Sequence, residues 1–472
     1  MSTRPIFINP RRIGVSSLRL GAFYTVASVE LGNTTAKCIL TSTNLKTAEI
    51  FVIEKEIVLT RGIRSVVPTE SVFGRTMTGI ELSQESVAEL VATLISSVVS
   101  RARMSIEGDL HFVVRSTGIT AGFERPEEIG TIVKALADGC LLVGVPPKKM
   151  TASLAPNNLP PSLRDYTWLQ RVHFDGAIAS SLPPANTEIV ANEMEGELVT
   201  AGIKGAAKST DIDFRNPVMT LDFGTTLAGR VTDDGHPYAK TIGSFAGLAG
   251  AIPDALARGA LLPENPLGCV MDLSENKRSK AEATQDEVDA VHEYIRVERV
   301  TPGTKRFGTV PVNAEAADES GVVLIGVDAG TDGSRLADLE ILGRGIVEAN
   351  GISYLLRLID EVQARTAQRI VSLAEEEGLL HPNTSLGLTG RGITTGEKPS
   401  IIASTLESKD GKHWMGNRDL IFVEDGLALG AAVAGRCMNS MGTRTNPMGG
   451  RKGDGCIMGA RMKRQRHHQS KR

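Results

Sequence analysis

The chain has 472 residues, too many for one compact core, so the usual sizes of domains predict roughly two to four domains. Its 41% hydrophobic and 23% charged residues are typical of a globular protein, and no segment reaches the ~18 apolar residues of a membrane helix. A net charge of −3 excludes a general attraction to nucleic acid or anionic membrane, and 4% aromatic residues argue against a stacking surface for single-stranded nucleic acid.

The cysteines and the first residues indicate a reduced, cytoplasmic protein. Five cysteines are scattered along the chain without a CxxC pair, which argues against a disulfide framework, a zinc ribbon or an iron–sulfur cluster. Cys38 and Cys140 are therefore expected to be small buried hydrophobic residues. The start, MSTRPIFINPRR, lacks the apolar stretch of a signal peptide.

In the first half of the chain, apolar residues alternate or recur at helical spacing. In chain order we expect a lead-in at 1–24, a strand at 26–29, a returning strand at 37–40, a β-rich segment at 48–59, a helix at 81–103, a strand at 111–114 with a polar turn at 115–118, a helix at 127–139, a proline-rich surface segment at 144–165 and a helix at 187–203. Small residues on this last helix, such as Gly196 and Gly202, would permit close contact with another helix.

The second half continues with alternating strands and helices. We expect a strand-turn-strand unit at 218–232, a partly helical segment at 243–262, a polar insertion at 264–320 with a helix at 286–297, a strand at 322–327, one or two helices at 339–377, strands at 386–388 and 420–423, and a helix of small residues at 426–438. The end, 459–472, holds six Lys or Arg and no acid. It is expected to be a solvated tail, and the alternative is an arm that docks on an acidic partner or RNA.

One short phrase occurs twice. VASVELGNTTAKC starts at Val26, and VMTLDFGTTLAGRV starts at Val218. Each is an apolar strand, an acid and then a turn of the Gly-Thr-Thr type. Glycine lets backbone N–H groups approach a phosphate, and threonine adds a hydroxyl donor. The repeat predicts two similar halves that face each other across a cleft, with both turns offered to one anionic ligand.

The residues of the two turns suit a phosphate and its metal ion. Glu30 and Asp222 precede the glycines and are the candidate catalytic acids and Mg²⁺ ligands, because Mg²⁺ takes few carboxylates and keeps several waters. The candidate phosphate-binding residues are Gly32, Asn33, Thr34, Thr35 and Lys37 in the first turn, and Gly224, Thr225, Thr226 and Arg230 in the second. Lys37 and Arg230 would neutralise phosphate charge if they point into the cleft.

A third glycine-rich turn, LGLTGRGITT from Leu386, follows a short strand. Its bare backbone could lie against adenine and ribose, so Gly387, Gly390, Arg391 and Gly392 are candidate nucleotide contacts. The segment 327–333, VDAGTDG, resembles another phosphate turn but is expected to be a structural turn, since two phosphate turns suffice.

These pieces, in this order, resemble the actin-like ATPase superfamily of sugar kinases, heat-shock chaperones and actin. The resemblance implies an α/β fold with two ribonuclease-H-like domains around an interdomain nucleotide cleft, and ATP and Mg²⁺ as cofactors. It also implies a domain I at 25–205 and a domain II at 206–438 that includes the insertion at 264–320 and a returning connecting helix at 426–438. The lead-in at 1–24 and a basic tail at 439–472 flank them.

Two narrower likenesses concern function. Residues 243–250 and 336–342 look like segments of the ATPase part of reductive activators of corrinoid proteins, although this chain lacks the cysteines for their iron–sulfur domain. The whole chain resembles the archaeal family called methanogenesis marker protein 14. That resemblance implies a protein partner in methyl transfer or methyl-coenzyme M reduction.

Three functions follow as alternatives. The first is an ATP-driven activator, reactivase or assembly factor for a methanogenesis enzyme; the second is a small-molecule kinase with Asp222 or Asp328 as base. The third is a nucleotide-binding scaffold without catalysis. The superfamily usually has aspartate where this chain has Glu30, and glycine or threonine where it has Asn33, which leaves ATP binding plausible and puts fast hydrolysis in doubt. A homodimer is left open.

Overall fold

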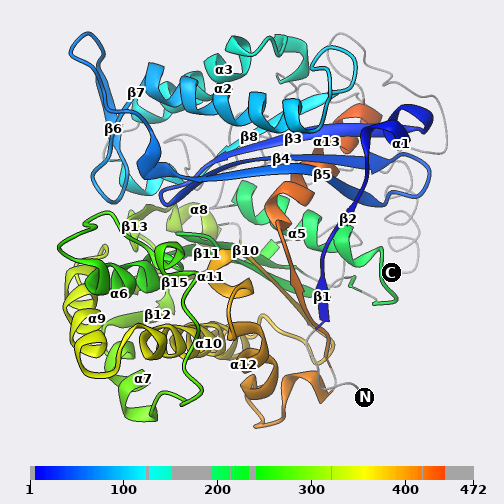
Figure 1. Ribbon diagram of the computed structural model, residues 1–472. Helices are drawn as coiled ribbons and strands as arrows, with labels where there is room; N and C mark the ends of the chain where they lie inside the picture. The colour runs from blue at the N-terminus through cyan, green and yellow to red at the C-terminus, as the bar shows by residue number, and fades with distance from the viewer. Residues whose placement is uncertain are drawn as a thin grey trace.

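The computed structural model describes residues 6–123, 127–150, 193–212, 214–215, 217–232, 241–319, 321–416 and 418–441. In these residues, two β-sheets flanked by helices form two domains, one above the other in Figure 1. Residues 442–472 of the predicted tail, with Cys456 among them, residues 151–165 of the predicted proline-rich segment and residues 187–192 of the predicted connecting helix lie outside the described residues.

Domain I is built on a five-stranded sheet in the order β2-β5-β4-β3-β8. Its strands are β2 (Arg11–Arg12), β3 (Phe23–Leu31), β4 (Thr35–Asn44), β5 (Ile50–Leu59) and β8 (Phe112–Thr117). Strands β3, β4 and β5 form an antiparallel meander, and β8 runs parallel to β3. Helices α2 (Gln84–Arg101) and α3 (Glu127–Leu142) cover the outer face of this sheet (Figure 1).

Domain II has an eight-stranded sheet in the order β1-β17-β16-β9-β10-β11-β15-β12. Its strands are β1 (Ile6–Ile8), β9 (Val218–Phe223), β10 (Leu227–Thr232), β11 (Thr241–Gly247), β12 (Ile295–Arg299), β15 (Val323–Ala329), β16 (Ser385–Thr389) and β17 (Leu420–Val423). Here β9, β10 and β11 form the antiparallel meander, and β16 runs parallel to β9.

The central strands of the two sheets therefore repeat each other in order and direction. The series β11-β10-β9-β16 corresponds strand for strand to β5-β4-β3-β8. This duplicated meander with a parallel fourth strand is the ribonuclease-H-like arrangement. The actin-like α/β fold that the resemblance implied is confirmed, and each copy of the repeated phrase forms the first hairpin of its sheet.

Two helices run between the sheets. Helix α5 (Glu193–Ala207) contacts β9, β10 and β16 of domain II, and α13 (Gly426–Met441) contacts β3, β4 and β8 of domain I. The helices meet at glycines: a Cβ on Gly202 would lie 1.9 Å from the Gly426 carbonyl oxygen, and one on Gly430 would lie 1.8 Å from that of Leu198. The close helix contact expected from small residues on α5 is confirmed.

The outer face of domain II carries three helices, the last of which is the longest in the described part of the chain. These are α6 (Ala251–Leu261), α9 (Leu336–Asn350) and α10 (Ile352–Glu376), with α9 and α10 separated at Gly351, where φ is +84°. The remaining elements are α1 (Val15–Leu20), η1 (Thr60–Gly62), β6 (Val72–Arg75), β7 (Glu81–Ser83), η2 (Ile119–Gly122), η3 (Pro147–Lys149), η6 (Val270–Leu273), α7 (Gln285–His292), β13 (Arg306–Phe307), β14 (Val310–Pro311), α8 (Ala314–Glu319), α11 (Arg391–Thr394), α12 (Lys398–Thr405) and η7 (Trp414–Gly416).

The first residues of the chain join the two sheets. Strand β1 pairs in parallel with β17 at the edge of the domain II sheet, and Phe7 stacks on Phe422 with ring centroids 5.4 Å apart. Strand β2, two residues further on, pairs with the start of β5 in domain I. The segment expected to be a simple lead-in is therefore a strap between the domains.

At three places the structure has a strand where another element was expected. The helix expected at 286–297 ends at His292, and 295–299 form strand β12 because Ile295 and Val297 alternate with charged residues. The turn expected at 115–118 is strand up to Thr117. The first residues of the helix expected at 81–103 pair as β7.

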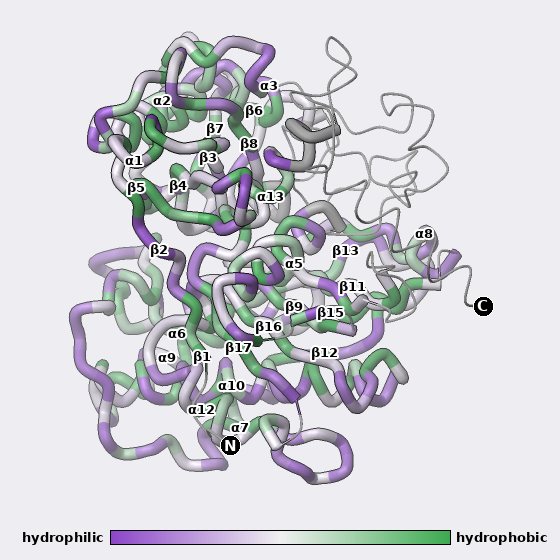
Figure 2. The backbone as a smooth tube through the Cα atoms, turned by 90° about the vertical axis from the view of Figure 1, so that its right-hand side faces the viewer, coloured by the Kyte–Doolittle hydropathy of each residue, from purple (hydrophilic) through white to green (hydrophobic). Residues whose placement is uncertain are grey.

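The apolar side chains gather in buried clusters around the two sheets and the connecting helices. Cys38 and Cys140 are fully buried in the domain I cluster, as predicted. Figure 2 shows the hydrophilic segments concentrated in the outer loops. Among the described residues, no helix has the length and apolar character required to span a membrane.

Candidate functional site

A cavity of about 430 Å³ lies between the two domains. Both copies of the repeated phrase and the third glycine-rich turn reach it. The candidate residues that line it are Glu30, Gly32, Asn33, Thr35, Lys37, Asp222, Gly224, Thr225, Thr226, Gly390, Arg391 and Gly392. Thr34, Arg230 and Gly387 are not among its lining residues. The structure thus brings together side chains that are distant in sequence, in a space of the size that small-molecule ligands occupy.

The first turn joins β3 to β4. The N–H of Gly32 donates to the Thr35 carbonyl (2.9 Å), and a Cβ on Gly32 would lie 2.9 Å from that same oxygen, so the turn requires glycine. Asn33 is buried: its amide nitrogen donates to the Gly118 carbonyl (2.8 Å), and its oxygen accepts from the Met77 N–H (2.9 Å). The Asn33 side chain is therefore used to fix the turn against neighbouring segments.

The second turn joins β9 to β10 and contacts the first. The Thr225 hydroxyl donates to the Thr34 hydroxyl (2.9 Å), which donates in turn to Asp254 Oδ2 (2.9 Å). The Gly224 carbonyl accepts from the Gly250 N–H at 2.7 Å, which ties the turn to the start of α6. Because Thr34 belongs to domain I and Asp254 to domain II, these bonds hold the two turns together across the cleft.

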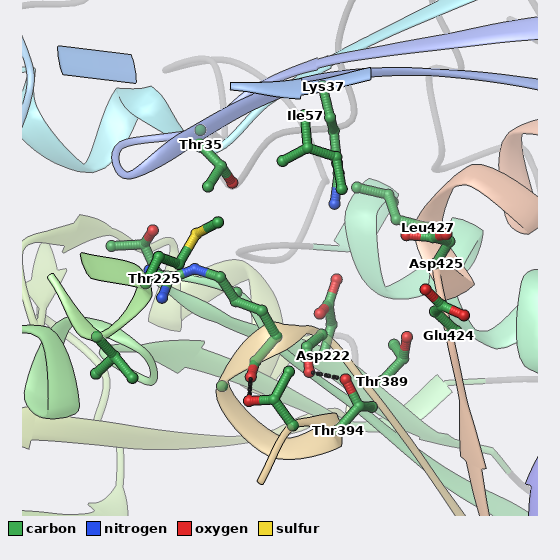
Figure 3. A pocket seen from close by; sticks show the side chains of 18 of the residues that line it. Thr35, Lys37, Ile57, Asp222, Thr225, Thr389, Thr394, Glu424, Asp425 and Leu427 are labelled. Atoms are coloured by element: carbon green, nitrogen blue, oxygen red, sulfur yellow. Dashed lines mark hydrogen bonds between the residues drawn. The ribbon is translucent and has the colours of Figure 1, made fainter. Parts of the chain in front are cut away.

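Lys37 and three carboxyl groups form the acidic end of the cavity. In the β3–β4 hairpin Lys37 is the direct cross-strand partner of Glu30, and its Nζ lies 2.8 Å from Glu30 Oε2. Figure 3 shows Lys37 pointing from the domain I sheet into the space above Asp222 and beside Asp425. Burial alone would lower the pKa of Lys37, but the charges of Glu30, Asp222 and Asp425 raise it above its ordinary value.

Asp222 lies at the end of β9. Its burial raises its pKa to about 7; Glu30 and Asp425 add to the rise, whereas Lys37 opposes it. The charges at this end of the cavity are therefore strongly coupled, and a ligand that brings positive charge would favour the ionised form of Asp222.

Glu195 on α5 was not predicted as a site residue. It lines the cavity and is 6% exposed, and its Oε2 has no hydrogen-bond partner. Burial, followed by the nearby charges of Asp222 and Glu30, raises its pKa well above its ordinary value, which favours the protonated carboxyl. The sequence signal was an acid on an otherwise small and apolar helix directly before the second phosphate-type turn.

Lys55, Glu424 and Asp425 were also missed. Lys55 extends from β5 of domain I, and its Nζ pairs with Glu424 and, at 3.1 Å, with Asp425 of domain II. Asp425 has φ +56° at the junction of β17 and α13, a conformation that aspartate tolerates better than most residues. No local pattern in the sequence connects the middle of β5 with this junction.

The third turn begins beside Asp222, and the part of the cavity beyond it has apolar walls and cationic groups. Gly390 has φ +91°, and a Cβ there would lie 2.2 Å from Asp222 Oδ1, so the third turn needs glycine at this position. Arg391 lines the cavity but is paired with Asp254, with Nη1 donating to Oδ1 at 3.1 Å. Beyond it, Met271 and Leu356 provide apolar surface.

Two cations in this part of the cavity form ion pairs with one buried carboxylate. Lys398 Nζ donates to Asp360 Oδ1 at 2.8 Å, and Arg278 Nε donates to Asp360 Oδ2. Both cations line the cavity, whereas Asp360 is fully buried. The carboxylate therefore fixes the two cations at the wall.

Arg230 and Gly387 instead contact α5. In the β9–β10 hairpin the partner of Asp222 is Ala228, and Arg230 pairs with Thr220, two residues further from the turn. There Arg230 is buried, forms an ion pair with Glu197 and donates from Nε to the Thr200 hydroxyl at 3.2 Å. A Cβ on Gly387 would lie 2.7 Å from the Ile203 side chain.

The turn at 327–333 is structural, as expected. The Asp328 carboxylate accepts from the N–H groups of Asp332 (2.8 Å) and Gly333 (2.9 Å), and pairs with Arg296 at 3.0 Å. Asp328 is fully buried and is not a lining residue of the cavity. Within the described part of the chain, no three His, Cys, Asp or Glu side chains form a group that could hold a metal ion.

Solved structures with similar shape include three proteins at low identity. The chain is 10% identical to an ethanolamine utilization protein EutJ from Carboxydothermus hydrogenoformans (TM-score 0.36; 87% of this chain, 89% of the other). It is 12% identical to a reductive activator for a corrinoid, iron–sulfur protein (TM-score 0.36; 88% and 60%). It is also 12% identical to a ROK hexokinase from Thermus thermophilus (TM-score 0.33; 87% and 97%).

Relatives in sequence are much nearer. A protein of Methanothermobacter thermautotrophicus is 49% identical over 459 residues, which cover 96% of this chain and 85% of the relative. A protein of Methanocaldococcus jannaschii is 46% identical over 461 residues, which cover 98% and 95%. Both are described as uncharacterized proteins. The model of one family matches residues 23–465, so the chain belongs to the family described as "uncharacterized protein conserved in archaea (DUF2114)".

Proposed function

We propose that the cavity binds ATP with Mg²⁺ and that the protein is an ATP-dependent conformational protein. The observation that carries the proposal is the meeting of both phosphate-type turns, one from each domain, at one cavity. A ligand held by both turns stabilises the arrangement in which they face each other. Binding and release would therefore change the relative position of the domains.

The residues at the acidic end fit a hydrated Mg²⁺. Glu30 and Asp222 line the cavity from opposite domains, and Mg²⁺ is held by one or two carboxylates together with waters and phosphates. The buried Glu195 oxygen without a partner indicates that this end is incomplete without a further polar group. Bound Mg²⁺ would supply neutralisation of the developing charge on the phosphate oxygens.

The chain's own residues would do the rest. The backbone of the two turns would donate to the phosphates, and Lys37 would neutralise one of them. Glu195, in its protonated form, would donate a hydrogen bond to a phosphate oxygen. We expect slow turnover, because Glu30 is one methylene longer than aspartate and the Asn33 amide is already bonded to Gly118 and Met77.

We propose a protein of methanogenesis as the partner, such as a corrinoid methyltransferase or methyl-coenzyme M reductase. The support is the resemblance of residues 243–250 and 336–342 to the ATPase part of corrinoid activators, and the two archaeal sources of the relatives. An activator or assembly factor would use domain closure and opening to act on that partner.

The first test is isothermal titration of the purified protein with Mg-ATP. Asp222→Ala should weaken binding at least about tenfold, because a loss of about 1.4 kcal/mol is tenfold in affinity. Asp338→Ala on the outside of α9 serves as the control and should bind as the wild type does. Absence of binding in the wild type, or binding that Asp222→Ala leaves unchanged, would remove ATP from the proposed cavity.

A scaffold that binds nucleotide without hydrolysis is the second candidate. It is favoured by the engaged state of the site, in which Lys37 pairs with Glu30 and Arg391 pairs with Asp254. Binding of Mg-ATP without release of inorganic phosphate, alone or with a partner, would support it. The kinase hypothesis is weakened because Asp328, one of its two candidate bases, is buried in its own turn.

A further inference from the structure

Lys37 lies among the acidic side chains at one end of the cavity. Its ammonium group lies 2.8 Å from Glu30 Oε2, and Asp222 and Asp425 are near enough to attract it. Figure 3 shows its side chain directed into the cavity between the two domains. Lys37 comes from domain I, whereas two of these three acids belong to domain II, so the lysine also joins the domains electrostatically.

Among the neighbouring groups, Lys37 is the cation that faces Glu30 and Asp222. Lys55, the other lysine at this end, is already paired with Glu424 and Asp425. Glu195, buried beside Asp222 and Glu30, has an oxygen without a hydrogen-bond partner. The acidic end thus holds more carboxyl groups than cations, and in the absence of ligand Lys37 is the counter-ion of Glu30.

We infer that Lys37 is an internal cation: its ammonium group occupies the place that the charge of a metal ion would take. The site therefore binds a divalent cation only together with a phosphate group. This inference rests on the proposed function of the cavity. A divalent cation that approaches Glu30 and Asp222 alone meets the Lys37 ammonium and is repelled by it. A cation that arrives with phosphate brings an anion that can take up the displaced ammonium, so the two charges separate.

The arrangement makes the site selective against free Mg²⁺. Free divalent cation would otherwise compete with the metal–phosphate complex for the acidic end. With Lys37 in place, the metal and the phosphate must come as a complex. The lysine then changes partner from a carboxylate to a phosphate, which breaks its ion pair with Glu30.

The test is binding of Mn²⁺ without nucleotide, followed by electron paramagnetic resonance of the free ion. The wild type should bind Mn²⁺ weakly. Lys37→Met, which keeps the length of the side chain and removes its charge, should bind Mn²⁺ at least about tenfold more tightly, as expected when a repelling unit charge leaves a partly buried site. Lys37→Arg should stay weak, and Lys46→Met, at an exposed position after β4, should behave as the wild type.

Several outcomes would overturn the inference. Tight Mn²⁺ binding by the wild type is one, and unchanged Mn²⁺ affinity in Lys37→Met is another. If Lys37→Met does not fold, Lys37→Gln makes the same comparison, while the wild-type measurement stands independently. In Lys37→Met, adding Glu30→Gln should remove most of the gain; a full gain without Glu30 would place the ion elsewhere.

The two proposals fail in different ways. The Mn²⁺ measurement contains no nucleotide, so it reports on Lys37 even if ATP is not the ligand. A protein that binds Mg-ATP but shows no gain of Mn²⁺ affinity in Lys37→Met keeps the proposed function and loses this inference. A protein that gains Mn²⁺ affinity in Lys37→Met but does not bind Mg-ATP keeps the inference about Lys37 and excludes ATP as the ligand.

Discussion

At the scale of single residues, the carboxyl group of Glu195 is the least expected member of the site. It sits on a helix between the domains, and its Oε2 has no hydrogen-bond partner although the residue is buried. A buried polar atom without a partner is costly and is usually retained for a function. Since burial and the nearby acids raise the pKa of Glu195, its protonated form can donate a hydrogen bond to an anionic ligand.

Replacing Glu195 by glutamine tests this role. The amide also carries donors and an acceptor, so Glu195→Gln should keep the stability of the wild type within about 1 kcal/mol. Mg-ATP affinity should change less than about threefold, whereas phosphate release should fall at least about tenfold if Glu195 passes a proton to the reacting group, because an amide donates a hydrogen bond but cannot give up the proton. Steady-state phosphate release and thermal unfolding are the measurements, with Glu85→Gln on the surface of α2 as the control. Equal loss of affinity and turnover would indicate a purely structural role.

The repeated phrase shows how far sequence reasoning reaches at the residue scale. It placed Glu30, Lys37, Asp222 and the two glycine turns around one cavity, because a strand that ends in glycine fixes where its acid lies. It treated Arg230 as the equivalent of Lys37, but register decides otherwise. Lys37 pairs with Glu30 itself, whereas Arg230 pairs with Thr220, deeper in the sheet and beneath α5. Cross-strand register could not be derived from the phrase alone.

At the scale of elements, the crossing of α5 and α13 connects the two sheets. Each helix packs on the sheet of a different domain, and they approach closely because Gly202 and Gly430 lack side chains at the contact. Glu195 lies on one of these helices, and Asp425 directly precedes the other. The geometry of the acidic end therefore depends on this crossing.

A methyl group at the crossing should disturb it. A Cβ on Gly430 would lie 1.8 Å from the Leu198 carbonyl oxygen, a backbone atom that cannot move independently. Gly430→Ala should lower the free energy of unfolding by about 3 kcal/mol, as overpacking does in close-packed interiors. Chemical denaturation measures the change. In the control, Gly345→Ala on α9, the new Cβ meets no atom within 4 Å, and this variant should be more stable by about 0.5 kcal/mol. If Gly430→Ala has the same free energy of unfolding as the wild type, the two helices can move apart at this contact without loss of stability.

The elements themselves were largely predictable. Strands with alternating or continuous apolar residues and helices with apolar residues at helical spacing appear near the expected positions, because local periodicity reports burial. The contributions of Lys55, Glu424 and Asp425 were not predictable, since β5 and the β17–α13 junction meet only through the packing of the two domains. The strand pairing of residues 6–8 was hidden for the same reason.

At the scale of the whole molecule, an ion pair joins the two domains. Arg61 of domain I donates from Nη1 to Asp272 Oδ2 at 2.7 Å and to the Leu267 carbonyl at 3.1 Å, both in domain II. Its Nη2 donates to the other oxygen of Asp272, so the contact is bidentate. Such forked pairs are stronger and more directional than ordinary surface ion pairs.

Arg61→Gln should therefore ease opening of the cleft. A loss of about 1 kcal/mol of closed-state stability would raise the dissociation rate of a bound nucleotide about fivefold, with little change in overall stability. Stopped-flow release of a fluorescent ATP analogue measures the rate. The control is Arg64→Gln, because Arg64 pairs with Glu70 and Glu89 within domain I. Equal release rates in the wild type and Arg61→Gln would exclude this pair as a latch.

The N-terminal strap, residues 6–12, connects the two sheets at one end of the cleft. The strap pairs with the first residues of β5, and Arg61 comes shortly after the last residue of β5. The strap and Arg61 therefore lie at opposite ends of a strand about 33 Å long. Asn9 and Pro10 alone separate β1 from β2, and the three Cα–Cα steps from Ile8 to Arg11 span at most about 11 Å when fully extended. This short connection keeps the two sheets together at that end. The domains should therefore rotate about it as a hinge, and a ligand should enter and leave at the opposite end of β5, beside Arg61.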